Sequence, residues 1–244
     1  MSEYDKNRPY VRSLHRKQGP GLPMQNMEML ELLCDEVNVN PRQVTLARAG
    51  NLEELQIEPT GARVDIVLDG GPPDFLGSGD ELLSGSLRVR ITFACEPCSH
   101  GASLASAPMR KFRRMQRFCG IVLAPGTVGP SGSPVRTVFG THPPVPESFA
   151  QRCAWAARQI PAGRVVPSVP FLKAVGASAA YARVLPRWLA AADLAGAPVH
   201  RILTSRFTSP SWCEKAVHRL GDEGLRPSDL RAAQFDLSRH LWLP

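Results

Sequence analysis

The chain has 244 residues, of which 43% are hydrophobic and 21% are charged, a globular composition that excludes a disordered protein. No apolar run approaches the roughly 18 residues that span a bilayer, and the N-terminus lacks a signal-peptide core, so we expect a cytoplasmic protein without a membrane partner. The net charge is +7, and all of it lies in residues 148–244, which hold 13 Lys and Arg against 6 Asp and Glu. A basic surplus confined to one region favours a partner with a phosphate backbone.

The first half of the chain is predicted to be rich in strands. Residues 1–25 are basic and polar and are interrupted by Gly and Pro, so we expect an irregular arm there. Runs with β-branched residues between Gly-rich turns predict strands at 42–47, 63–68, 87–93, 121–123 and 135–138. Asn51 is expected to cap a short helix over 52–55. These signals predict a β domain over residues 26–140.

The chain then changes character at a Pro-rich segment, 141–147, which has the composition of a stiff linker. Beyond it the signals are those of helices. Ser148 is expected to cap a helix over 149–159, and Ser168 to cap a second helix that ends at Gly176.

A third helix, over 179–192, is expected to be capped by Ser178 and kinked by Pro186. Together with the preceding helix it would make a helix-turn-helix, followed by a wing over 202–212 and a closing helix over 213–220. The predicted fold class is therefore α+β with two domains, a β domain followed by a mainly α winged helix-turn-helix domain over 148–244.

Several motifs occur together in the second domain. They are Ile160-Pro161-Ala162-Gly163-Arg164-Val165, Ala182-Arg183-Val184, Ala197-Pro198-Val199-His200-Arg201-Ile202 and the tail over 235–244. This region resembles the O6-alkylguanine-DNA alkyltransferases and the alkyltransferase-like proteins, which bind alkylated DNA without repairing it. The resemblance implies a winged-helix domain that binds double-stranded DNA, associates with the nucleoid and flips a modified base out of the stack.

Val199 stands where that family has its acceptor Cys, and because Val has no nucleophilic atom we expect no alkyl transfer. The resemblance implies that Arg183 enters the base stack, and that Ser168 replaces a Tyr that helps to turn the target phosphate. The expected DNA contacts are Ser168, Tyr181, Arg183, Arg187, Arg201 and Arg206, and the expected base pocket consists of Pro198, Val199 and His200. Since there is no thiol to activate, His200 is expected to be a hydrogen-bonded structural residue.

A second group of motifs lies in the first domain. Phe93-Ala94-Cys95-Glu96-Pro97-Cys98 ends a predicted strand, and Arg117-Phe118-Cys119-Gly120 and Gly126-Thr127-Val128 follow it. This order resembles the MOSC family, the β-barrel domains of molybdenum-cofactor sulfurases and of molybdenum-dependent amidoxime and N-hydroxylamine reductases. The resemblance implies a β-barrel in which Cys98 is the catalytic residue and binds molybdenum or carries sulfur.

The chemistry of these residues agrees with that implication. A thiolate is a soft ligand that suits molybdenum, and nearby cations would hold a pterin phosphate and lower the pKa of the thiol. The expected cofactor contacts are Cys98, Arg63, Arg114 and Arg117, while Asp65 stands where the family often has Asn. Cys95, Cys98, His100 and Cys119 also raise a zinc hypothesis, but only one close cysteine pair is present, so zinc is not expected.

Three functional hypotheses follow. In the first, the protein acts in DNA damage and repair, and it binds DNA and flips an alkylated or N-hydroxylated base without alkyl transfer, coupled to MOSC chemistry. In the second, it is a non-enzymatic lesion sensor whose structural β domain recruits other DNA-repair proteins. In the third, it is a molybdenum-cofactor, sulfur-transfer or N-hydroxylamine-reducing enzyme. Whether the protein is an enzyme depends, in these hypotheses, on whether Cys98 binds molybdenum or carries sulfur.

Overall fold

The computed structural model describes residues 8–19, 23–72, 75–97, 99–177, 179–208 and 210–243, and within these ranges all side chains except those of residues 99, 100, 179 and 180. The chain forms two compact units. The N-terminal unit consists of Met1–Asp35 and Arg42–Pro144, and the C-terminal unit of Glu36–Pro41 and Val145–Pro244. The chain therefore enters the C-terminal unit twice, and residues 36–41 lie outside the β domain to which the sequence assigned them.

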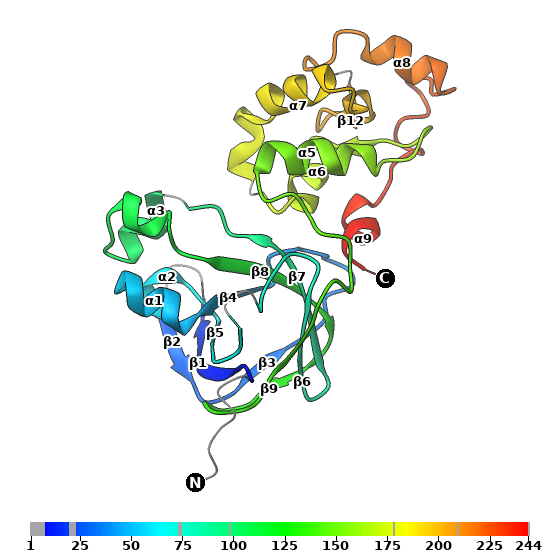
Figure 1. Cartoon of the computed structure of the whole chain (residues 1–244). Coiled ribbons are helices and arrows are strands. Elements are labelled where there is room, and N and C mark those ends of the chain that lie inside the picture. The colour runs from blue at the N-terminus through cyan, green and yellow to red at the C-terminus, as the bar shows by residue number, and fades with distance from the viewer. Residues whose placement is uncertain are drawn as a thin grey trace. The chain divides into compact units, whose positions relative to one another are not determined.

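The N-terminal unit is built on a curved sheet with the strand order β10-β6-β7-β8-β4-β5-β1-β2 (Figure 1). Its strands are β1 (Tyr10–Lys17), β2 (Met24–Met27), β4 (Val44–Arg48), β5 (Ile66–Asp69), β6 (Glu81–Ser84), β7 (Leu87–Ala94), β8 (Arg117–Ala124) and β10 (Arg136–Val138). All neighbours are antiparallel except β4 and β5. A bridge between Tyr10 and Pro134 joins β1 to the segment before β10 and closes the sheet on itself. β3 (Leu30–Leu32) and β9 (Gly126–Val128) form a separate antiparallel pair.

Alternating strand residues supply two hydrophobic cores, because successive side chains point to opposite faces of a sheet. Leu46 of β4 and Ile66 of β5 belong to the core on one face. Their neighbours Ala47 and Val67 belong to the core on the other face. Helices α1 (Ala49–Leu55), α2 (Pro59–Ala62), α3 (Ser99–Leu104) and α4 (Met109–Phe112) accompany the sheet, and Leu52, Ala62 and Phe112 complete this second core.

The predicted irregular arm over 1–25 is wrong for residues 10–17, which form β1 and pair with both β2 and β5. Val11 and Leu14 are buried in the core, and this burial stabilises the strand. The basic residues around them led the sequence analysis to predict an irregular segment instead. Two boundaries also move. The strand predicted from residue 63 begins at Ile66, because Arg63 ends α2 with a φ of 57°. Asn51 lies inside α1 and does not cap it, and its Oδ1 accepts a hydrogen bond from the Gln116 amide.

The C-terminal unit is mainly helical. Its elements are α5 (Phe149–Arg158), β11 (Val166–Pro167), α6 (Ser168–Ala174), η1 (Ala179–Arg183), α7 (Leu185–Leu194), η2 (Val199–Arg201), β12 (Ile202–Leu203), α8 (Ala216–Asp222) and α9 (Leu237–Trp242). The predicted cap at Ser148 is confirmed, since its hydroxyl accepts a hydrogen bond from the Gln151 amide. Gly176 has a φ of 74° just after α6, as expected of a glycine that ends a helix.

Other helix predictions need correction. Ser168 is the first residue of α6 and makes no capping hydrogen bond. The single helix predicted over 179–192 is divided into the 3₁₀ turn η1 and the helix α7, and Pro186 lies in the first turn of α7, where its missing N–H costs nothing. Instead of kinking one long helix, Pro186 therefore lies where a separate helix, α7, begins. Ser178 lies outside the described residues.

The segment expected to form a wing contains β12, which pairs in parallel with β11. Within 202–208 and 210–212, β12 is the only strand. The fold is thus α+β, and the winged-helix assignment stays a prediction. Of the helices in the described ranges, none has the length and apolar character needed to cross a membrane.

Candidate thiol and anion site

The N-terminal unit contains a pocket of about 330 Å³ in which thiols and cationic side chains meet. β1 contributes Lys17 to this pocket, β4 contributes Thr45, and β8 contributes Arg117 and Cys119. Its lining residues are Lys17, Met24, Arg42, Thr45, Arg63, Asp65, Cys95, Gly101, Arg117 and Cys119. Four cations, two thiols and one carboxylate therefore surround one small volume.

Cys95 and Cys119 are in direct contact across two neighbouring strands. Cys95 follows β7, and its amide donates a hydrogen bond to the carbonyl oxygen of Arg117 in β8. This pairing places the Cys95 and Cys119 side chains on the same face of the sheet, and their Sγ atoms lie 2.7 Å apart. Both are free thiols. Cys119 is fully buried and Cys95 is 9% exposed, so Cys95 is the more accessible of the two.

Two arginines accompany this thiol pair. Arg42 Nη1 donates to Cys95 Sγ at 3.8 Å, and its Nη2 forms an ion pair with Glu96. Arg117 is buried, and its Nη1 donates to the carbonyl oxygen of Ala62. Its buried Nε has no hydrogen-bond partner among the residues that the structure describes. Since buried donors are nearly always paired, this N–H is a candidate contact for a ligand.

The pair is asymmetric in acidity. A hydrogen bond from Cys119, aided by the positive charges of Arg117 and Arg42, lowers the pKa of the Cys95 thiol to about 6. Burial and the same contact raise the pKa of the Cys119 thiol well above its usual range. These opposite shifts favour ionisation of Cys95 over ionisation of Cys119.

Asp65 supplies the carboxylate of the pocket. Its Oδ2 accepts hydrogen bonds from the Thr45 amide at 2.8 Å and from the Thr45 hydroxyl at 2.6 Å. Burial raises the pKa of Asp65 in spite of these hydrogen bonds, so its carboxyl group keeps a proton at higher pH than an exposed Asp does.

The structure brings only part of the predicted cofactor set together. Arg63 and Arg117 line the pocket. Arg114 does not line it, because its exposed guanidinium pairs with Glu54 at 2.6 Å. Cys98 lies outside the described residues. Arg42 and Lys17 were missed, since no local motif marks a cation that approaches the thiols from a distant strand or loop.

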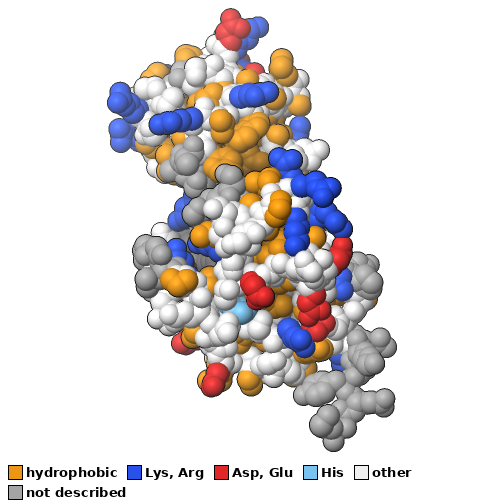
Figure 2. Space-filling model, turned by 90° about the vertical axis from the view of Figure 1, so that its left-hand side faces the viewer, with side chains coloured by type: hydrophobic (Ala, Val, Ile, Leu, Met, Phe, Trp, Pro, Cys, Tyr) orange, Lys and Arg blue, Asp and Glu red, His pale blue; other side chains and the backbone are white. Residues whose placement is uncertain are grey.

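In the C-terminal unit, the predicted DNA contact Tyr181 packs against Trp188. Tyr181 and Trp188 are half-buried and stacked, with ring centroids 5.9 Å apart and an angle of 27° between the rings. Arg183, at the end of η1, and Arg187, in the first turn of α7, are both exposed. Arg206 is exposed and Ser168 is half-buried. On the face shown in Figure 2, Lys and Arg side chains of this unit stand apart among hydrophobic ones.

The residues of the predicted base pocket are mostly buried, and their assignment to a base stays a prediction. Val199 is fully buried, and Pro198 is half-buried. His200 Nε2 lies 2.8 Å from Glu223 Oε1, which confirms the hydrogen-bonded structural histidine. Arg201 pairs with the same carboxylate at 2.7 Å and donates to the carbonyl oxygen of Ile160, so it is used inside the unit.

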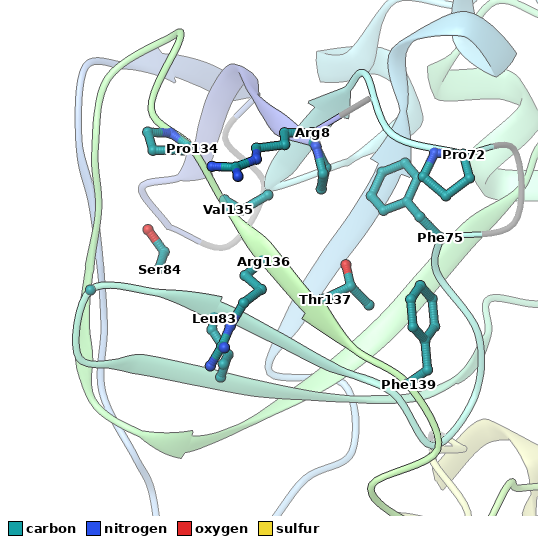
Figure 3. A pocket seen from close by; sticks show the side chains of 12 residues that line it. Arg8, Pro72, Phe75, Leu83, Ser84, Pro134, Val135, Arg136, Thr137 and Phe139 are labelled. Carbon is teal, nitrogen blue, oxygen red and sulfur yellow. The ribbon is translucent and has the colours of Figure 1, made fainter. Parts of the chain in front are cut away.

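A larger pocket, of about 680 Å³, lies elsewhere in the N-terminal unit, between β6 and the segment that leads into β10 (Figure 3). Phe75, Phe139, Arg8 and Arg136 are among the side chains that line it. Its described lining contains no cysteine, histidine or carboxylate. The smaller pocket is therefore the better candidate for chemistry.

No family model and no curated protein matches the chain. Among solved structures, the chain is similar to the YuaD protein from Bacillus subtilis, with 15% identity, a TM-score of 0.46 and coverage of 53% of this chain and 94% of that one. It is also similar to YiiM from Geobacillus stearothermophilus (15%, TM-score 0.40, coverage 86% and 96%) and YiiM from Escherichia coli (16%, TM-score 0.42, coverage 74% and 91%). Function is therefore argued from the side chains.

Proposed function

We propose that the N-terminal unit binds the molybdenum cofactor at the thiol pocket and reduces N-hydroxylated compounds. The observation that carries this proposal is the meeting of Cys95, Cys119 and four cationic side chains in one pocket. The MOSC resemblance of the cysteine motif adds the identity of the cofactor. DNA recognition becomes a second, separate proposal for the C-terminal unit.

The residues present fit such a cofactor. Thiolates are soft ligands that suit molybdenum, and Lys and Arg side chains bind phosphate groups. Lys17, Arg42, Arg63 and Arg117 supply the positive charge, and the buried Nε of Arg117 is a donor that an anionic oxygen would satisfy. Cys98, which the MOSC resemblance assigns as the metal ligand, follows Cys95 by three residues.

The chain would contribute binding and proton delivery. Arg63, Arg117 and Lys17 would hold the phosphate, and Arg42 would keep Cys95 ionised. The bound cofactor would supply the electron pair. Conversion of an N-hydroxylamine to an amine and water also consumes two protons, and the Asp65 carboxyl, held by Thr45 and with a raised pKa, is the side chain suited to deliver one.

The test uses the full chain, made in cells that synthesise the molybdenum cofactor. Molybdenum and pterin are measured per chain for the wild type, Arg117→Gln, Cys98→Ser and Arg114→Gln, and reduction of an amidoxime is followed with an artificial electron donor. We expect a loss of bound molybdenum in Arg117→Gln and Cys98→Ser only. Arg114→Gln is the matched control, because Arg114 belongs to the same basic run but pairs with Glu54 in solvent.

Two results would redirect the proposal. Equal molybdenum content in Arg117→Gln and the wild type would remove the pocket from the cofactor site. A folded wild type without molybdenum, but with one extra sulfur atom on Cys98 by peptide mass, would replace reduction by sulfur transfer.

For the C-terminal unit we propose DNA binding through Arg183 and the stacked pair Tyr181–Trp188. The observation in favour is that exposed cations flank aromatic rings on one segment, the combination that holds a phosphate backbone and stacks on bases. Fluorescence anisotropy of the full chain with labelled duplexes tests it. Arg183→Ala should weaken binding to an O6-methylguanine duplex more than binding to an undamaged one.

Arg239→Ala is the matched control, because it removes the same charge from an exposed position on α9. This substitution should weaken binding to the damaged and the undamaged duplex slightly and by the same factor. Absence of salt-dependent binding in the wild type would refute the DNA proposal without affecting the cofactor proposal.

A further inference from the structure

We propose that Cys95 and Cys119 are a peroxide-reactive pair, and that a hydroperoxide converts them into a reversible disulfide between β7 and β8. This inference goes beyond the proposed function, since it needs neither the cofactor nor Cys98. It assigns a modification site to two residues that the sequence motifs treated only as neighbours of Cys98.

The geometry already approaches that of the bonded state. The two Sγ atoms are 2.7 Å apart, and a disulfide bond is about 2.05 Å long, so bond formation requires a shift of less than about 1 Å. The backbones are held in register by the hydrogen bond from the Cys95 amide to Arg117 and by the pairing of Phe93 with Cys119. The strand pairing therefore holds the two thiols next to each other.

The two cysteines differ in the ways that the chemistry requires. Both cysteines line the pocket, but Cys95 is 9% exposed and Cys119 fully buried, so a small peroxide reaches the Cys95 sulfur first. It lies near the cationic groups Arg42 and Arg117, which favour its thiolate and would also stabilise a departing oxyanion. Cys119 is fully buried and burial raises the pKa of its thiol, which suits a resolving thiol that acts only after Cys95 is oxidised.

The reaction balances in two steps. The Cys95 thiolate attacks one peroxide oxygen, an S–O bond forms, the O–O bond breaks, and the departing oxygen takes a proton to leave as an alcohol, or as water from hydrogen peroxide. The Cys119 sulfur then attacks the Cys95 sulfenic sulfur, the S–S bond forms, and hydroxide leaves with the Cys119 proton as water. Two thiols lose two electrons, and one hydroperoxide gains them.

The experiment uses the reduced full chain made in cells that lack the molybdenum cofactor, so that failure of the proposed function cannot affect the outcome. One equivalent of hydrogen peroxide is added, the protein is unfolded in denaturant so that buried thiols are also accessible, free thiols are blocked with iodoacetamide, and linked peptides are identified by mass. We expect a Cys95–Cys119 link, loss of both residues from the alkylated set, and full recovery with dithiothreitol. Cys34, Cys153 and Cys213 should stay alkylatable, as internal controls in the same sample.

Two variants separate this pair from its sequence neighbour. Cys98→Ser should form the Cys95–Cys119 link as the wild type does. In Cys119→Ala, Cys95 lacks its resolving thiol, so in alkaline solution, where Cys95 is ionised in the variant as well, a Cys95 sulfenic acid should accumulate and be trapped by dimedone. A link that requires Cys98, or oxidation of Cys95 no faster than that of Cys34, would overturn the inference. Both outcomes are measured on the wild type and on Cys98→Ser, so the test does not depend on the folding of Cys119→Ala.

Discussion

Arg114 and Arg117 lie three residues apart and have opposite environments. Arg117 is buried and donates to the carbonyl oxygen of Ala62, whereas Arg114 lies in solvent against Glu54. The two arginines were equivalent members of one basic run in the sequence. The start of β8 at Arg117 separates them, because it turns the Arg117 side chain into the thiol pocket.

Loss of the buried arginine should therefore cost stability, and loss of the exposed one should not. Arg117→Met leaves the Ala62 carbonyl oxygen without its donor, and we expect a loss of about 1–3 kcal/mol in the free energy of unfolding of the N-terminal unit. Arg114→Met should change it by less than about 0.5 kcal/mol, because exposed ion pairs contribute little. Denaturant unfolding followed by circular dichroism measures both, and equal effects would contradict the burial of Arg117.

The acidity of Cys95 depends on its neighbour. In the wild type, the rate of alkylation of Cys95, read from its own peptide, should rise with pH and reach half its maximum near pH 6. Cys119→Ala removes the hydrogen bond that is the largest cause of the lowered pKa, so the midpoint should move up towards the value of an ordinary thiol. Cys153→Ala, a buried cysteine of the C-terminal unit, should leave the midpoint unchanged.

Glu223 should make the C-terminal unit sensitive to acid. Burial alone would raise its pKa, but hydrogen bonds from Arg201, His200 and the Gly163 amide lower it to about 2. Because the folded value is below the ordinary one of 4.5, this carboxylate stabilises the fold above pH 4.5, and the contribution is lost as the pH falls towards 2. Glu223→Gln should remove about 2–3 kcal/mol at neutral pH together with that acid dependence.

Tryptophan fluorescence is the measurement for this prediction, since all four tryptophans of the chain lie beyond residue 148, in the C-terminal unit. Glu214→Gln is the control, because Glu214 is exposed. An acid transition that is the same in the wild type and Glu223→Gln would show that another carboxylate is responsible.

The two serines at helix starts should differ. Ser148→Ala removes the hydrogen bond to the Gln151 amide at the start of α5 and should cost about 1 kcal/mol. Ser168→Ala removes no capping bond from α6 and should cost less than about 0.5 kcal/mol. The same fluorescence signal compares them, and a larger loss for Ser168→Ala would mean that its hydroxyl has another role.

Local signals predicted the elements whose cause is local. Side-chain alternation predicted the strand at 87–93, the hydroxyl of Ser148 predicted a helix cap, and the tolerance of Gly176 for a positive φ predicted a helix end. Each of these signals depends only on residues that are close together in the sequence. β1 was missed because its stability comes from pairing with β5, more than fifty residues later.

The same distinction holds at the site. The cysteine motif drew attention to residues 95–98, and Arg63 and Arg117 were expected near it and do line the thiol pocket. The contact of Cys95 with Cys119 and the approach of Arg42 depend on strand register and on a residue 53 positions away. No short pattern in the sequence encodes either of them.

The double passage of the chain through the C-terminal unit affects how the two units can be separated. Residues 36–41 contribute the buried Val39 to that unit, and Asn38 accepts a hydrogen bond from Lys173. A protease that cuts once near residue 145 would break the backbone but leave this six-residue piece attached to the N-terminal fragment. The two fragments would then be expected to copurify after digestion, as a peptide and its receptor do, until a denaturant releases the piece.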